Sequence, residues 1–186
     1  ADPAMCRPAA DRVAELLGTP VEDLRILPFR GEYWGLASSA AGLVRGHLYP
    51  VPDPRFPHLG VHFTRSVAGD VEVGPNAVWA WGREAYGRWS IDVRDSVDTL
   101  SYGGFWSLAR RHWRTGVAEQ WRSWNRRAFA RNARAMLPDL TVDHLAGWRS
   151  GIRAQAVARD GTLVHDFVIR EAAGVVNVLN APSPAA

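Results

Sequence analysis

Two neighbouring segments decide the fold: LYPVPDPRFPHLGVHFTR at residues 48–65 and VEVGPNAV at residues 71–78. Their five prolines exclude a helix. The end of the first segment, Leu59 to Arg65, predicts a short strand because apolar and polar residues alternate along it. One face of this strand would carry Leu59, Val61 and Phe63, and the other His62 and Thr64.

The residues that follow this strand predict a hairpin. Ala68-Gly69-Asp70 has the composition of a tight turn, and Val71 and Val73 then alternate on a returning strand. His62 is the unusual residue of the hairpin, because strands that pack on a core rarely place a titratable side chain inward. We therefore expect His62 to have a specific partner or a chemical role.

The rest of the chain predicts a mixture of helices and strands. A helix over residues 8–17 would bury a stripe of Val13, Leu16 and Leu17 and end at Gly18. Residues 37–42 predict a loop of small residues, and a helix is expected to begin near residues 82–84. Strands are predicted over residues 26–34, 43–49, 151–157, 163–170 and 175–180, with turns at residues 160–161 and 173–174.

Residues 101–137 predict a helical segment, divided near Gly116 and followed by Pro138. Interleaved aromatic and basic residues can bind nucleic acid, by stacking bases and contacting phosphates. The helical period instead predicts that the apolar residues face a core and the arginines face solvent, so we expect no nucleic-acid partner. The apolar residues that recur at this period are Trp106, Trp113, Val117, Trp121, Trp124 and Ala128.

The composition indicates a globular protein, with 47% hydrophobic and 22% charged residues among 186. All 22 basic residues are arginine, yet the formal net charge is only +3. Cys6 is the only cysteine, which favours a reducing cytoplasm. No apolar run approaches the ~20 residues of a membrane span, and no signal peptide is expected, although peripheral membrane contact is left open. No metal site is expected, because the histidines lack ligand spacing.

Six blocks of the sequence resemble the FAD-dependent L-2-hydroxyglutarate oxidases and dehydrogenases, which belong to the D-amino-acid-oxidase-like flavoproteins. They follow one another in the family's order. The resemblance extends over nearly the whole chain, but it corresponds only to the second half of the family's length. The blocks are PFRGEY (28–33), YPVPDPRFP (49–57), LGVHFT (59–64), GPNAV (74–78), GIRAQ (151–155) and NAPSPAA (180–186).

The resemblance implies an α+β fold, with a largely antiparallel substrate-domain sheet packed by the Trp-rich helices. Residues 26–150 would form the substrate domain, and residues 1–25 and 151–186 would be pieces of an FAD-binding α/β domain whose N-terminal βαβ unit is absent. The chain contains no G-x-G-x-x-G turn, which would lie in the missing half. The final residues, 183–186, predict the first turn of a helix at which the chain is truncated.

Oxidation of a 2-hydroxy acid needs a base for the hydroxyl proton and a cation for the adjacent carboxylate. His62 is the candidate catalytic base, and the alternative is a core histidine that is hydrogen-bonded across the sheet. Arg153 is the candidate carboxylate clamp, since its Gly-x-Arg block resembles the carboxylate-binding position of related amine oxidases. The alternative is a solvated strand arginine.

Four further residues are candidates by the same resemblance. Arg30 and Tyr33 would line the substrate pocket, because their strand is similar to the family's crossing into the substrate domain. A structural pairing of Arg30 with Glu32 is the alternative. Asn180 and Ser183 would contact the flavin, and an ordinary capped helix is the alternative there.

The predicted function is FAD-dependent oxidation of L-2-hydroxyglutarate, or of a similar small 2-hydroxy dicarboxylate, to the 2-oxo acid. This chain would supply the substrate-side half, and its partner would be the missing N-terminal FAD-binding half. The alternative is a catalytically silent truncated fragment or one half of a split oxidoreductase. The sequence leaves the electron acceptor open among oxygen, a quinone and an electron-carrier protein.

Overall fold

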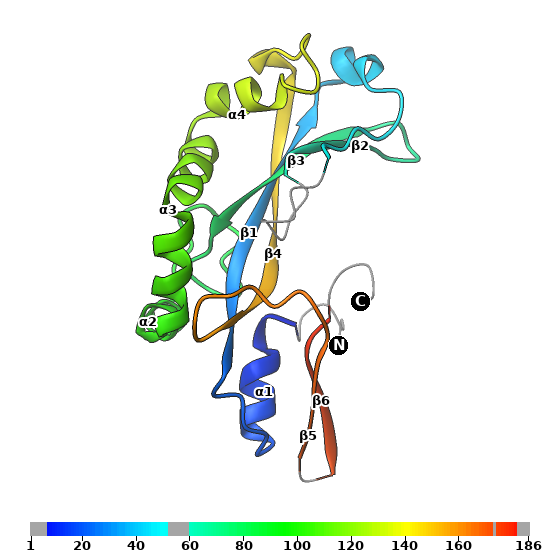
Figure 1. The fold of residues 1–186 in the computed structure, drawn as a ribbon. Coiled ribbons are helices and arrows are strands. Elements are labelled where there is room, and N and C mark those ends of the chain that lie inside the picture. Colours follow the sequence, from blue (N-terminus) through cyan, green and yellow to red (C-terminus); the bar gives the residue numbers. More distant parts are fainter. Residues whose placement is uncertain (1–6, 52–59, 173, 182–186) are drawn as a thin grey trace. The chain divides into compact units, whose positions relative to one another are not determined.

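The computed structural model describes residues 7–51, 60–172 and 174–181 and shows an α+β fold (Figure 1). Four strands form a sheet in the order β2-β3-β1-β4: β1 (Leu24–Leu36), β2 (His62–Arg65), β3 (Val71–Trp79) and β4 (Leu145–Ala158). Strands β5 (Val168–Ala172) and β6 (Val175–Asn180) pair separately. The α-helices are α1 (Ala10–Leu16), α2 (Val93–Ser101), α3 (Gly103–Trp124) and α4 (Arg126–Ala133), and the 3-10 turns are η2 (Arg7–Ala9), η3 (Ser38–Leu43) and η4 (Val142–His144). The predicted mixture of helices and antiparallel strands is confirmed.

The chain folds into two compact units, and each unit is built from segments that are far apart in the sequence. The first unit contains the described residues of 1–29, 79–113 and 152–186, and the second contains those of 30–78 and 114–151. Strands β1 and β4 and helix α3 therefore contribute residues to both units. The assignment of residues 1–25 and 151–186 to a flavin domain, and of residues 26–150 to a substrate domain, stays a prediction.

The predicted hairpin is present in the second unit as β2 and β3. Phe63 lies opposite Val73 in an antiparallel register, and Gly69 takes a φ of +95° in the connecting turn. Phe63 and Val73 are fully buried, whereas His62 is only half-buried. The predicted alternation of faces is therefore confirmed; Leu59 lies outside the described residues.

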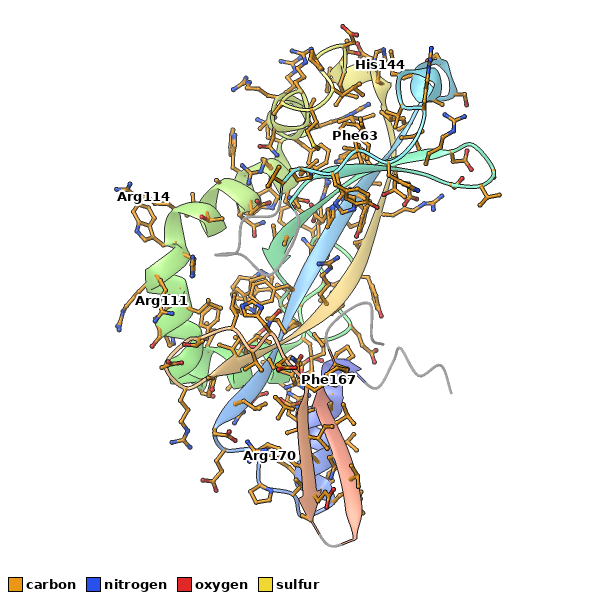
Figure 2. The ribbon with its side chains drawn as sticks, turned by 45° about the vertical axis from the view of Figure 1, so that its right-hand side comes forward. Phe63, Arg111, Arg114, His144, Phe167 and Arg170 are labelled. Atoms are coloured by element: carbon orange, nitrogen blue, oxygen red, sulfur yellow. The ribbon has the colours of Figure 1, made fainter. Side chains whose placement is uncertain are left out.

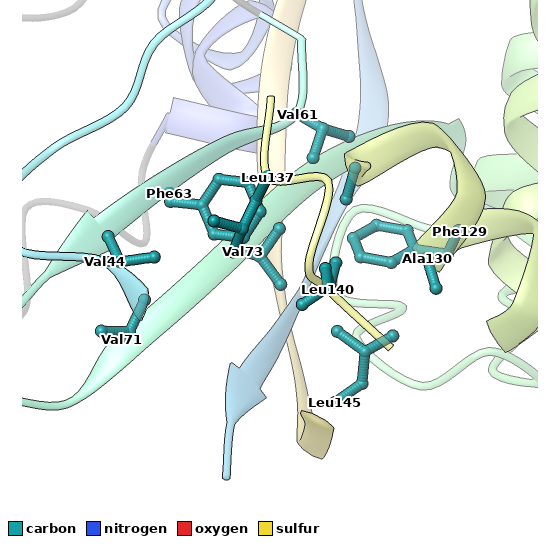
Figure 3. Packing of buried hydrophobic residues seen from close by; sticks show 11 residues of the cluster. Val44, Val61, Phe63, Val71, Val73, Phe129, Ala130, Leu137, Leu140 and Leu145 are labelled. Atoms are coloured by element: carbon teal, nitrogen blue, oxygen red, sulfur yellow. The ribbon is translucent and has the colours of Figure 1, made fainter. Parts of the chain in front are cut away.

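Helix α4 covers the buried face of this sheet. Its Phe129 joins Phe63 and Leu140 in one hydrophobic cluster (Figure 3). Trp34 of β1 packs against the same phenylalanine, with ring centroids 6.5 Å apart. The helix starts where the Asn125 side chain accepts a hydrogen bond from an amide of the first turn. Residues of β2 and β3, with Trp34 of β1, thus pack against α4 in the core of the second unit.

The predicted strand over residues 43–49 is wrong. The 3-10 turn η3 takes up Ser38–Leu43, and only Leu48 forms an isolated bridge, to Phe63. Leu48 and Phe63 exchange two backbone hydrogen bonds of 2.9 Å each. The ladder cannot extend through Pro50, because proline has no N–H to donate.

Three further boundaries differ from the predictions. Residues 82–84 form a turn, and α2 begins only at Val93, where the Asp92 side chain accepts from the amide of Asp95 at 2.8 Å. Helix α3 continues through Gly116 and is kinked at His112 instead. The strand that was predicted over residues 163–170 starts only at Val168, as β5.

The tryptophans of α3 do not face a core, contrary to the prediction. Trp121 and Trp124 are each 57% exposed, and Val117 is 62% exposed. In the same part of the helix, Ser123 is 2% exposed. The helical period correctly grouped the apolar residues on one face of α3. The opposite, polar face points toward the sheet, because Ser123 and Glu119 form hydrogen bonds with strand residues there. The two earlier tryptophans of α3, Trp106 and Trp113, belong to the first unit and are 47% and 58% exposed.

Helix α1 also buries a different face from the one that the sequence predicted. It spans Ala10–Leu16 and ends before Gly18, which has a φ of +76°, so its existence is confirmed. Its buried residues are Asp11 and Ala14, whereas Leu16 is 86% exposed. Asp11 faces inward because it is the centre of a network of ion pairs.

This network holds the first unit together. The Asp11 carboxylate accepts two hydrogen bonds from the Arg83 guanidinium and one of 3.0 Å from the Ile26 amide of β1. Arg83 also contacts Asp98 of α2 at 3.2 Å, and Arg25 of β1 pairs with the same carboxylate. Three segments of the chain are therefore joined through buried and half-buried charges, each of which has an opposite partner.

We expect Asp11→Ala to destabilise the protein by about 3–5 kcal/mol, because it leaves the Arg83 charge and the Ile26 amide buried without their acceptor. The free energy of unfolding is measured with urea by circular dichroism. Asp139→Ala, at an exposed position, is the control and should change stability by less than about 0.5 kcal/mol. Equal stability of the two variants would contradict the role given to Asp11.

Candidate active-site residues

His62 belongs to a row of residues that crosses three strands of the second unit. It lies directly opposite Gly74 on β3. Gly74 in turn is pressed against β1, where an added Cβ would lie 2.6 Å from the Glu32 carbonyl oxygen and 3.0 Å from the Tyr33 Cα. With its φ of +151° this position accepts only glycine. His62, Gly74 and Tyr33 are therefore consecutive across the sheet.

His62 and Tyr33 lie on the same face of this sheet. The neighbours of His62 on β2 point into the core with Phe129 of α4, so His62 points to the opposite side. On β1, Glu32 contacts α3 and Trp34 contacts α4, so Tyr33 between them also points away from the helices. The structure thus brings together the predicted base and one predicted pocket residue.

The His62 ring is held by local contacts. Its Nδ1 lies 3.0 Å from the Gly60 carbonyl oxygen, and its ring is 4.8 Å from that of Tyr49. A carbonyl oxygen only accepts, so the neutral ring carries its proton on Nδ1, and Nε2 is the basic nitrogen. The Gly60 contact comes from two residues away along the chain. The role of His62 as a catalytic base stays a prediction.

Arg30 lies on the other face of β1, in a buried ion pair with Glu32. Its Nε and a terminal nitrogen are 3.0 and 2.8 Å from Glu32 Oε1, and both residues are at most 2% exposed. Ser123 of α3 donates its hydroxyl to the same oxygen at 2.8 Å. This pairing is the structural role that the sequence left open for Arg30, and it separates Arg30 from Tyr33.

The other candidates belong to the first unit. Arg153 is an exposed residue of β4, and no acidic partner for it occurs among the described residues. Asn180 ends β6 and donates its side-chain amide to the carbonyl oxygens of Val164 and Asp166, at 3.2 and 2.7 Å. Ser183 lies outside the described residues. The convergence of Arg153 and Asn180 with His62 stays a prediction.

Sequence reasoning missed a second, half-buried carboxylate in the second unit. Glu119 of α3 accepts a 3.3 Å hydrogen bond from the Ala77 amide and pairs with Arg122, and its carbonyl oxygen accepts from the Asn76 side chain at 3.2 Å. Burial raises the pKa of Glu119, and the neighbouring Glu32 carboxylate adds to the rise against the effect of Arg122. The signal was present, because Glu119 is the single acidic residue between Gly103 and Pro138.

A pocket of about 430 Å³ in the first unit is lined by members of the ion-pair network, Arg12, Arg83 and Asp95 among them. Each of these arginines is already bonded to a carboxylate, so an anion could bind only by displacing it. None of the predicted site residues lines this pocket. We therefore assign it a structural role.

The described residues contain no glycine-rich turn of the kind that holds a flavin dinucleotide. Strand β1 is followed by η3, whose sequence is SSAAGL, and not by a glycine-rich turn and helix. Asn180 is the one predicted flavin contact among the described residues, and its side-chain amide already donates to the Val164 and Asp166 carbonyl oxygens. No group of three or more potential metal ligands occurs among these residues, and no helix formed by them has the length and apolar character needed to cross a bilayer.

No family model matches the sequence. The chain is 45% identical over 177 residues to the L-2-hydroxyglutarate dehydrogenase of Indibacter alkaliphilus. It is 45% identical over 182 residues to the mitochondrial enzyme of Nematostella vectensis and 42% identical over 183 residues to that of Homo sapiens. Each match covers 95% of this chain.

The chain is homologous to the L-2-hydroxyglutarate dehydrogenases. The match confirms the resemblance that the sequence blocks indicated. The chain spans 44% of the Indibacter protein, 40% of the Nematostella protein and 39% of the human protein, and it corresponds to their C-terminal part. Among solved structures, dithionite-reduced L-alpha-glycerophosphate oxidase from Mycoplasma pneumoniae with FAD bound is similar, with a TM-score of 0.52 and 18% identity over 96% of this chain and 36% of that one. That likeness supports the fold.

The raised pKa of Glu119 predicts a pH dependence of stability. Because the folded state holds this proton more tightly than the unfolded state, the contribution of Glu119 is full below its ordinary pKa of 4.5 and is lost as the pH rises through the folded pKa. Glu119→Gln removes the titration. Urea unfolding between about pH 4 and 8 should show the variant gaining stability relative to the natural protein as pH rises.

The exposed Glu84→Gln is the matched control and should run parallel to the natural protein over the whole range. Parallel curves for Glu119→Gln as well would show that the Glu119 carboxylate titrates alike in both states.

Proposed function

We propose that this chain is the substrate-side part of an FAD-dependent enzyme that oxidises L-2-hydroxyglutarate to 2-oxoglutarate. The observation that carries the proposal is the 45% identity to L-2-hydroxyglutarate dehydrogenase over 95% of the chain. The chain spans less than half of that relative, so the proposed activity belongs to a longer assembly. The cytoplasmic location inferred from the single cysteine is part of the same proposal.

The residues of this chain would bind the substrate and move its proton. Nε2 of His62 would take the hydroxyl proton while the hydrogen on the α-carbon leaves with its electron pair, so that the alcohol becomes a carbonyl. The guanidinium of Arg153 would hold the adjacent carboxylate with two parallel hydrogen bonds. Tyr33, on the same face as His62, offers a hydroxyl to the distal carboxylate.

The flavin would supply the acceptor for the hydride and would be held mainly by the rest of the longer protein. Two observations support this division: the absence of a glycine-rich turn from the sequence and the partial coverage of the relatives. The same coverage supports the second candidate, a catalytically silent fragment or one half of a split oxidoreductase. The two candidates differ in whether a complementary N-terminal half restores turnover.

A fusion tests the proposal directly. The N-terminal part of the Indibacter alkaliphilus relative, which this chain does not match, is joined to the chain, and the product is purified with FAD. We expect a yellow protein whose flavin bleaches when L-2-hydroxyglutarate is added without oxygen, and not when D-2-hydroxyglutarate is added. The chain alone should lose FAD on desalting. A folded, yellow fusion that does not bleach would favour the silent fragment.

Arg153→Gln in this fusion should raise the KM for L-2-hydroxyglutarate roughly 10- to 100-fold, because a charged hydrogen-bonding contact to the carboxylate is lost. Arg149→Gln is the matched control: Arg149 is an exposed arginine on the same strand, paired with Glu72 at 2.8 Å. Similar KM values for the two variants would remove Arg153 from the substrate site.

His62→Gln should lower the rate of flavin reduction about 10²- to 10⁴-fold, as expected for loss of a general base. The control is His47→Gln, a neighbouring histidine whose ring lies 6.0 Å from Tyr49. Stopped-flow absorbance at saturating substrate separates this step from binding. Unimpaired reduction in His62→Gln would exclude the proton transfer assigned to it.

A further inference from the structure

His62 has an aromatic neighbour on the side of β2 that faces away from β3. Phe63 of β2 (Figure 2) exchanges two backbone hydrogen bonds of 2.9 Å with Leu48. In an antiparallel pair, the residues next to such a bonded pair also lie opposite each other, with their side chains close together. Tyr49 is therefore placed directly opposite His62, and their ring centroids are 4.8 Å apart with the rings tilted by 37°.

The row of residues continues on the other side of His62 through Gly74. A Cβ added to Gly74, which lies opposite His62, would be 2.9 Å from Cδ1 of Tyr33. The Tyr33 ring therefore occupies the space that a side chain at position 74 would take. His62 thus lies between two tyrosines, with Tyr49 in ring contact on one side and Tyr33 beyond the glycine on the other.

The imidazole of His62 is held at its edge as well as on its face. Its Nδ1–H donates to the Gly60 carbonyl oxygen at 3.0 Å. Gly60 has a φ of +72°, a conformation that favours glycine, so the backbone itself sets the direction of this carbonyl. The ring can leave the carbonyl only by rotating against the ring of Tyr49.

We propose that Tyr49 is a positioning residue for the base of the oxidation, a role that rests on the proposed function. Its ring keeps the imidazole of His62 in the orientation that leaves Nδ1–H on the Gly60 carbonyl and Nε2 as the proton acceptor. When Nε2 takes the hydroxyl proton of the substrate, His62 becomes a cation, and a cation beside a tyrosine ring is stabilised. The ring of Tyr49 performs both tasks, and its hydroxyl is not needed.

The exposure of Tyr49 separates this role from ordinary packing. Its side chain is 52% exposed, and it is absent from the hydrophobic cluster that contains Phe63. Truncation of a surface side chain of this kind changes stability little. Tyr49→Ala should therefore remain folded, and Tyr49→Phe keeps the ring contact while it removes the hydroxyl.

NMR of the purified chain tests the positioning without any turnover. With ¹⁵N-labelled histidine, the two ring nitrogens of His62 have different shifts when only one of them carries the proton. At about pH 8, above the ordinary range of histidine, we expect the Nδ1–H form in the natural chain and in Tyr49→Phe. Tyr49→Ala should show averaged shifts, because a released ring populates both tautomers.

Tyr86→Ala is the matched control, since Tyr86 is 50% exposed and belongs to the first unit. It should leave the His62 shifts unchanged. An unmixed Nδ1–H form in Tyr49→Ala would overturn the proposal. Equal mixing in the Tyr86→Ala chain would also overturn it.

Flavin reduction in the fusion then tests whether the positioning matters for the reaction. Tyr49→Ala should lower the rate at saturating L-2-hydroxyglutarate roughly 10- to 100-fold, the usual loss when a reacting group is misplaced. The KM should change by less than about threefold, and Tyr49→Phe should stay within about twofold of the natural rate. In a His62→Gln background, Tyr49→Ala should cost less than a further twofold or about that, because Tyr49 acts through His62.

Three kinetic results would contradict the role of Tyr49. They are a natural rate in Tyr49→Ala, a large loss in Tyr49→Phe, which would place the hydroxyl on the substrate, and additive losses in the double variant. Failure of the proposed function looks different, because the unmutated fusion would then not bleach or His62→Gln would reduce the flavin normally. In that case the NMR spectra of the chain still decide whether Tyr49 holds the His62 ring.

Discussion

The buried carboxylate of Glu32 is the constraint around which the second unit is arranged. It accepts hydrogen bonds from Arg30 on its own strand and from Ser123 of α3, so one face of the sheet is committed to a polar contact with that helix. Breaking this contact would take one hydrogen-bond donor from a buried carboxylate, which costs about 1–3 kcal/mol. Helix α3 must therefore turn its polar side inward, and its tryptophans are left outside. The opposite face of the sheet is left to His62 and Tyr33.

The hairpin of β2 and β3 could be predicted from the sequence because local rules act alone there. Alternation of apolar residues and a glycine turn set its register, and the core then accepts Phe63 and Val73 as expected. The faces of α1 and α3 could not be predicted in this way. A helical period separates two faces without saying which one is buried, and here Asp11 and Glu119 are drawn inward by partners more than 40 residues away, Arg83 and Ala77.

Some residues of the candidate site could be predicted from the sequence, and others could not. Motif blocks located His62, Tyr33 and Arg153, since the family resemblance concerns short stretches that survive in this chain. The closeness of His62 and Tyr33 could not be read from those stretches, because it depends on Gly74 allowing β1 and β3 to approach. Glu119 was missed because a lone acid among arginines is ordinarily a solvated residue.

The interleaved composition of the two units has a consequence for the order in which the protein can fold. The core of the first unit joins Ala14 of α1 to Leu179 of β6, and Asn177 donates to Thr19 at 2.7 Å. A ribosome exposes the N-terminal half of that core long before β6 has been synthesised. The second unit, by contrast, holds all its segments between residues 30 and 151. The first unit can therefore be completed only after β6 has been synthesised, and α1 must wait for that strand.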